Sequence, residues 1–149
     1  MAPTATAYPK TRYASPATPA PDFTSRHERE RLSVPALKAF FNIIERWSIR
    51  DEDARELLGG VSNGPYYQMK KSQEGRTLSA DELFRISYLI GIFKALHSLH
   101  AADLADRWVR LANSNRIFGG QTPLEFMKKG GQQAMETVRE LLEARIQGK

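Results

Sequence analysis

Residues 57–82, LLGGVSNGPYYQMKKSQEGRTLSADE, place glycines, hydroxyl groups, an asparagine and a lysine pair between two segments with helical patterns. A glycine-rich turn binds phosphate when it follows a strand and carries dinucleotide or P-loop spacing. Here the turn follows a helical pattern, lacks a Gly-Lys-Ser/Thr sequence and has no predicted parallel sheet around it, which excludes a phosphate loop. What remains is a short helix, a turn and a second helix, the order typical of a helix-turn-helix.

The second helix of such a motif enters the major groove of DNA, which indicates the candidate contacts. Small polar residues at its start can reach base edges, and lysines at its end can contact phosphates. Three helices packed only for stability, with an incidental lysine pair, would show the same pattern, so the pattern alone leaves both interpretations open. The candidate DNA-binding residues are Ser62, Asn63, Tyr66, Tyr67, Lys70, Lys71 and Arg76.

The other polar groups do not form a catalytic set. His97, His100 and Asp103 follow at spacings of three on one helical face, but a structural zinc site usually needs four ligands and no fourth is evident. The carboxylates of DEDARE, residues 51–56, are explained by their place in the first turn of a helix. No combination of Ser, His and acid stands out. We therefore expect no metal, no cofactor and no enzymatic activity.

The composition of the chain limits its size class, its partners and its cellular environment. The 149 residues, 41% of them hydrophobic, suffice for one domain or two very small ones, and the net charge of +5 favours a polyanionic partner without naming it. The absence of cysteine excludes disulfides and thiolate sites and fits a reducing cytoplasm. The most apolar stretch, residues 83–99, is interrupted by Arg85, Lys94 and His97, which favours a core helix over a membrane span.

The apolar spacing predicts an all-α fold, because no segment alternates with a period of two. The first helix is expected to begin at Ser33 as N-cap, with Pro35 in its first turn. Ser79 and Glu82 form a predicted capping box at the start of the longest helix. Further helices are expected within residues 48–60, 65–71, 101–113, 122–129 and 132–146, and the proline-rich residues 1–31 are expected to be a flexible tail.

Two stretches of the chain carry a family resemblance. The first, ARELLGGVSNGPYYQMKK at residues 54–71, is similar to an Xre-like helix-turn-helix, although it has a second glycine after Gly59 and carries Gln68 and Met69 where an aromatic residue is more usual. The second resembles the C-terminal toxin-binding domain of the Xre/MbcA/ParS antitoxins. It is marked by Trp108, Asn113, Phe118, Gly119, Gly120, Pro123, Leu124, Gly131, Leu141, Leu142 and Ile146.

The resemblance implies an Xre-like helix-turn-helix DNA-binding domain at residues 32–100 and a small helical toxin-binding domain at 101–149. It further implies that the protein represses its own operon and covers the active site of a cognate NAD-consuming RES-domain toxin, as a homodimer within a larger type II toxin–antitoxin complex. The alternative is a plain transcriptional regulator whose C-terminal helices only dimerise. The candidate toxin-binding residues are Phe118, Gly119, Gly120, Phe126, Arg139, Leu142, Arg145, Ile146 and Lys149.

Overall fold

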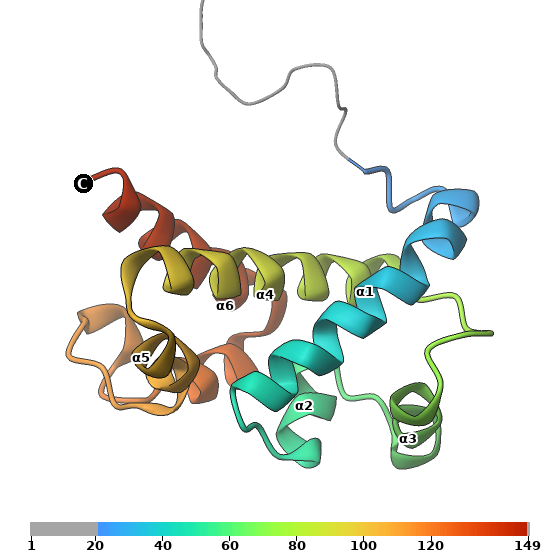
Figure 1. The fold of residues 1–149 in the computed structure, drawn as a ribbon, viewed down its shortest axis with the longest axis horizontal. Coiled ribbons are helices and arrows are strands. Elements are labelled where there is room, and N and C mark those ends of the chain that lie inside the picture. Colours follow the sequence, from blue (N-terminus) through green and yellow to red (C-terminus); the bar gives the residue numbers. More distant parts are fainter. Residues whose placement is uncertain (1–20, 149) are drawn as a thin grey trace, which may run out of the picture.

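The all-α fold is confirmed by the computed structural model, which describes residues 21–148 (Figure 1). Six α-helices and two short 3₁₀ helices, at Trp108–Arg110 and Arg116–Phe118, occur in that range, and no strand does. The α-helices are α1 (Arg26–Arg46), α2 (Asp51–Leu57), α3 (Asn63–Lys71), α4 (Ala80–Leu99), α5 (Ala102–Arg107) and α6 (Pro123–Ile146). None of the described helices is long and apolar enough to cross a membrane.

Helix α1 begins earlier than the sequence pattern predicts. Ser25 is its N-cap, and the Ser25 hydroxyl accepts a hydrogen bond from the Glu28 N–H. The charged residues 26–31 form the first turns of α1 and are not part of a tail. Phe23, before the helix, is buried and packs edge-to-face on Phe84 at 4.8 Å between ring centroids. The predicted tail is therefore wrong for residues 22–31, and residues 1–20 lie outside the described part.

Ser33 lies inside α1 and is not its cap. Its buried hydroxyl donates to the Arg29 carbonyl at 2.6 Å and accepts from the Leu78 N–H at 2.8 Å. The sequence pattern was misleading because a serine two residues before a proline looks like a helix start, whereas Pro35 is accommodated inside the helix. The Ser33 hydroxyl thus ties the segment before α4 to α1.

Helix α4 is the central element and packs most extensively against α6 and α1. The predicted capping box is confirmed, since the Glu82 N–H donates to the Ser79 hydroxyl and the Ser79 N–H donates to the Glu82 carboxylate. On α4, Leu89 and Ile92 are fully buried, and Ile90 and Phe93 are half-buried. Because the helix is covered on two sides, its apolar residues do not form one single stripe.

Helix α6 consists of two helical segments joined at Gly131, whose φ of 65° and ψ of −143° are not helical. The two predicted helices at 122–129 and 132–146 correspond to these segments. The first begins as predicted, with Pro123 in the first turn and the Thr122 hydroxyl accepting from the Glu125 N–H.

The helices form one continuous core that includes buried residues from every α-helix. Along the longest axis of the molecule, α3 lies at one end, and α5 and the C-terminal end of α6 lie at the other (Figure 1). The predicted boundary between residues 100 and 101 is therefore not a boundary in the packing.

Candidate functional site

The predicted helix-turn-helix consists of α2, the turn at residues 58–62 and α3. Gly59 and Gly60 adopt φ values of 103° and 87°, which residues with a side chain rarely adopt, and the Gly60 N–H donates to the Arg55 carbonyl to end α2. Ser62 occupies the N-cap position of α3, but its hydroxyl makes no capping hydrogen bond. The turn therefore directs the chain into α3 and leaves the Ser62 side chain exposed.

Most of the predicted DNA-binding residues lie on the surface. Tyr67 is 48% exposed, and Ser62, Asn63, Lys70, Lys71 and Arg76 are exposed as well. Gln68 is also exposed on α3. In the sequence it was noted only as a residue at a place where an aromatic residue is more usual in the family. Asparagine and glutamine amides can pair with adenine in the major groove, so Asn63 and Gln68 are the side chains of α3 best suited to base contacts.

Tyr66 was predicted to contact DNA but is buried in the structure. Its side chain is fully buried, its ring packs edge-to-face on Phe41 at 5.6 Å, and its hydroxyl donates to Asp51 at 2.8 Å. Burial and then the hydrogen bond to Asp51 raise the pKa of Tyr66. Since its ring faces the core and its hydroxyl faces α2, Tyr66 holds α3 in place and cannot reach a base edge.

Asp51, at the start of α2, is the common acceptor for three side chains of α3. It accepts from the hydroxyls of Tyr66 and Tyr67, at 2.8 and 3.2 Å, and pairs with Lys70 Nζ at 2.8 and 3.1 Å. The hydrogen bond from Lys70 holds the pKa of Asp51 below its usual range. The charge of Lys70 is therefore partly neutralised within the molecule, and Lys71 and Arg76 are the stronger candidates for phosphate contacts.

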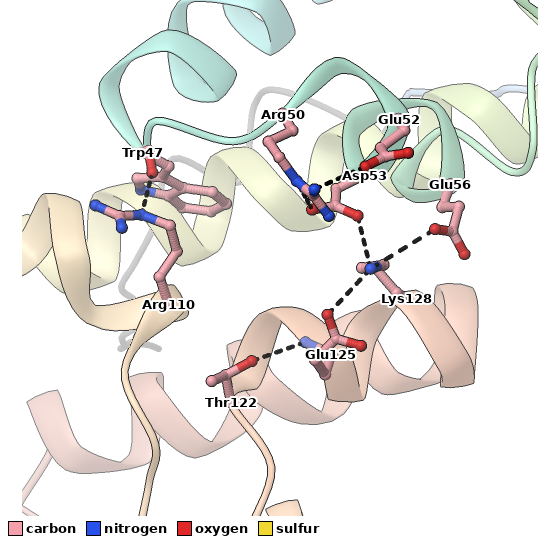
Figure 2. A network of polar contacts seen from close by, with 9 residues as sticks. All are labelled: Trp47, Arg50, Glu52, Asp53, Glu56, Arg110, Thr122, Glu125 and Lys128. Carbon is pink, nitrogen blue, oxygen red and sulfur yellow. Dashed lines mark hydrogen bonds and ion pairs between the residues drawn. The ribbon is translucent and has the colours of Figure 1, made fainter.

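Figure 2 shows a second network, in which α6 meets α2. Lys128 Nζ lies 2.6 Å from Asp53 Oδ1, 3.0 Å from Glu125 and 3.6 Å from Glu56. The Lys128 and Asp53 side chains are only 12% and 9% exposed, and the hydrogen bond with Asp53 is the main cause that raises the pKa of Lys128. This pair could not be predicted from the sequence, because no local pattern links residues that lie so far apart in the chain.

Arg85 of α4 reinforces the same junction. Its Nε donates to Asp81 at 2.9 Å, and its guanidinium group reaches the Leu57 carbonyl at the end of α2 at 3.4 Å. A Cβ atom added to Gly131 would lie 3.3 Å from Arg85, so the guanidinium group packs closely on the kink of α6. In addition, Gln132 donates to Asp81 at 2.9 Å.

The predicted toxin-binding residues divide into core and surface. Phe118, 2% exposed, packs edge-to-face on Trp108 and on the half-buried Phe126, and Leu142 is fully buried, so Phe118 and Leu142 are core residues rather than exposed anchors. Arg139 lies over the Tyr88 ring at 4.8 Å. Gly119, Gly120, Arg145 and Ile146 are exposed, and Lys149 lies outside the described residues.

The histidine cluster considered as a metal site is not assembled. His97 Nε2 lies 3.2 Å from Asp106 Oδ1, a partner that the spacing did not indicate. Within residues 21–148, no three His, Cys, Asp or Glu side chains are placed to hold a metal ion.

Comparisons with known proteins cover most of the chain. Residues 25–91 match the family described as the antitoxin Xre-like helix-turn-helix domain, and residues 95–148 match the antitoxin Xre/MbcA/ParS C-terminal toxin-binding domain. The uncharacterized protein y4oB of Sinorhizobium fredii is 37% identical over 117 residues, which are 77% of this chain and 88% of that protein. No solved structure matches the chain.

Proposed function

Because this chain belongs to the Xre/MbcA/ParS family of antitoxins, with a helix-turn-helix DNA-binding domain and a toxin-binding domain, we propose that its toxin is a NAD-consuming RES-domain enzyme. The antitoxin covers the active site of that enzyme and represses its own operon. The match of residues 95–148 to a toxin-binding domain favours this function over a plain regulator whose C-terminal helices only dimerise. The same proposal places the protein in the cytoplasm, as a homodimer within a larger complex whose symmetry a palindromic operator would match.

The observation that carries the proposal is the separation of the two candidate surfaces. Helix α3 lies at one end of the molecule and the C-terminal turn of α6 lies at the other (Figure 1). Both segments carry exposed residues. Blocking an enzyme requires only that its pocket be covered, and an interface of about 1,600 Å² in total can do so with high affinity. One chain can therefore bind DNA and toxin through different surfaces.

The DNA half of the proposal is tested through salt dependence. In a chain carrying Lys71→Ala and Arg76→Ala, we expect weaker operator binding and a flatter plot of log affinity against log salt, by about one unit for each phosphate that is no longer neutralised. Binding is measured by fluorescence anisotropy on the DNA upstream of the gene. Lys38→Ala with Lys94→Ala is the matched control, because it removes the same charge from exposed positions on α1 and α4.

Two outcomes of this experiment would count against the DNA half. If the unchanged protein fails to bind the upstream DNA at low salt, the helix-turn-helix does not act on that operator. If the control pair lowers the salt slope as much as the pair at Lys71 and Arg76, the attraction comes from the overall charge of the protein and not from the helix-turn-helix.

The toxin half is tested by a stop codon after Ala144, which removes Arg145, Ile146 and Lys149 among the last residues. Arg145 and Ile146 are exposed, so the fold should persist. We propose that the basic residues 145–149 enter the pocket of the toxin. Co-expression of the truncated chain with the RES-domain protein should therefore fail to preserve cellular NAD. Operator binding should remain.

The variant with Lys71→Ala and Arg76→Ala serves as the reciprocal control, since it should preserve NAD while binding DNA weakly. Full protection by the truncated chain would exclude its last residues as the blocking element. Failure of the full-length chain to co-purify with a RES-domain protein encoded beside it would contradict the proposed identity of the toxin.

A further inference from the structure

Helix α2 is held from two sides by carboxylates of its own first turn. Asp51 binds the side chains of α3, and Asp53 binds Lys128 of α6. The helix dipole alone would account for acidic residues at these positions, but in the structure each of the two has a partner on a different helix. The seven-residue α2 thus lies between the toxin-binding domain and the helix that is proposed to read DNA.

The contact with α6 is the less exposed of the two. Lys128 and Asp53 are each about nine-tenths covered, and Nζ and Oδ1 are 2.6 Å apart, whereas Asp51 and Lys70 are 30% and 48% exposed. Without Lys128, the mostly buried Asp53 would keep only Arg50 as a cationic partner, at 3.4 Å and with an Arg50 side chain that is 71% exposed. Loss of the buried partner should therefore disturb the structure around Asp53 more than breaking a surface pair does. The position of α2 should therefore depend on Lys128.

Helix α3 has few other attachments that could keep its direction if α2 moved. Tyr66 and Met69 are its only buried residues, and Tyr66, whose ring packs on Phe41 of α1, is bonded through its hydroxyl to Asp51 of α2. A displacement of α2 would thus be passed to α3 through the Asp51 contacts. Because base contacts require close geometry, a small change in the direction of α3 would lower operator affinity without removing any group that touches DNA.

We propose that Lys128, which belongs to the toxin-binding domain, is a positioning residue for the DNA-reading helix and acts through Asp53 and α2. The DNA-binding domain then requires α6 for full operator affinity. This inference rests on the proposed operator binding. Lys128 is not assigned a DNA contact, because its charge is surrounded by Asp53, Glu125 and Glu56.

The test compares Lys128→Met with Lys129→Met in the full-length chain. Both substitutions remove one positive charge from neighbouring residues, but Lys129 is exposed. We expect Lys128→Met to weaken operator binding about tenfold, as if about a tenth of the molecules had α3 in the competent direction. The slope of log affinity against log salt should stay unchanged, because every side chain that neutralises a phosphate is still present. Lys129→Met should bind nearly as the unchanged protein does.

A double-substitution cycle separates positioning from a general failure of folding. Asp53→Asn with Lys128→Met removes both charges, so no buried charge is left alone, and circular dichroism should show an intact fold. If Lys128 acts through Asp53, the double variant should bind the operator no more weakly than Lys128→Met alone. If the reductions in operator affinity caused by Asp53→Asn alone and by Lys128→Met alone add up in the double variant, the proposal is overturned.

The remaining outcomes are also decisive. Unchanged operator affinity in Lys128→Met would refute the positioning role and leave the proposed DNA binding intact. A reduced salt slope in Lys128→Met would show that Lys128 itself neutralises a phosphate and would also refute it. If the unchanged protein binds no operator DNA, the proposed function and this inference both fall.

Discussion

Replacing Phe118 with alanine is expected to lower the free energy of unfolding by about 3–5 kcal/mol, the usual cost of removing a buried phenylalanine ring. Phe118 is 2% exposed and packs edge-to-face on Trp108 and Phe126, at 6.1 and 5.3 Å between ring centroids. Since the total stability of a domain is about 5–15 kcal/mol, this reduction would leave the C-terminal part close to unfolding at about 37 °C. Urea denaturation followed by circular dichroism measures the change.

The neighbouring residue offers a matched control. Ile117 is 38% exposed, so Ile117→Ala should change the stability by much less, on the order of 0.5 kcal/mol. If Phe118→Ala left the urea midpoint unchanged but abolished binding to the toxin, Phe118 would be an interface anchor, as the family resemblance implied, and its burial in the free chain would have been misinterpreted.

Gly131→Ala is expected to lower the free energy of unfolding by about 2–4 kcal/mol. The backbone of Gly131, at φ 65° and ψ −143°, lies close to a region that is essentially restricted to glycine. An added Cβ would also lie 3.3 Å from the Arg85 guanidinium group, which is itself held by Asp81 and the Leu57 carbonyl. Differential scanning calorimetry should therefore show a clear fall in Tm.

Gly120→Ala separates the two causes. Gly120 also has a positive φ, of 87°, but a Cβ added to it would meet no atom within 4 Å. Its substitution should therefore cost only the backbone strain, about 1 kcal/mol. Equal reductions in the two variants would mean that the contact between Arg85 and Gly131 contributes nothing to the kink of α6.

The sequence predicted the features that depend on neighbouring residues. The capping box of Ser79 and Glu82 and the start of α6 at Thr122 and Pro123 are correct, because caps are formed within one turn of the chain. The helix-turn-helix was found for the same reason, since the glycines that end α2 and the polar start of α3 are adjacent in the sequence.

Two of the wrong predictions share a physical cause, which is that the partner of the residue lies far away in the chain. Ser33 looks like a cap but binds the N–H of Leu78, and Tyr66 looks like a DNA contact but its ring packs on Phe41. The pair of Lys128 and Asp53 was not predicted at all, because a carboxylate in a first turn already has a local explanation. Burial and long-range pairing are decided by the tertiary structure and leave little local signal.

We expect the position of α4 to limit recombination between the gene of this protein and others that encode the same two domains. The segment that matches the helix-turn-helix domain ends at residue 91 and the segment that matches the toxin-binding domain begins at residue 95, so the junction falls inside α4 (Ala80–Leu99). A crossover there joins the first half of one parent's α4 to the α6 of the other parent, across the most extensive helix contact in the molecule. We expect such chimaeras to have mismatched cores. New pairings of operator and toxin should therefore arise by substitutions on the exposed faces of α3 and α6, with the whole chain inherited as one unit.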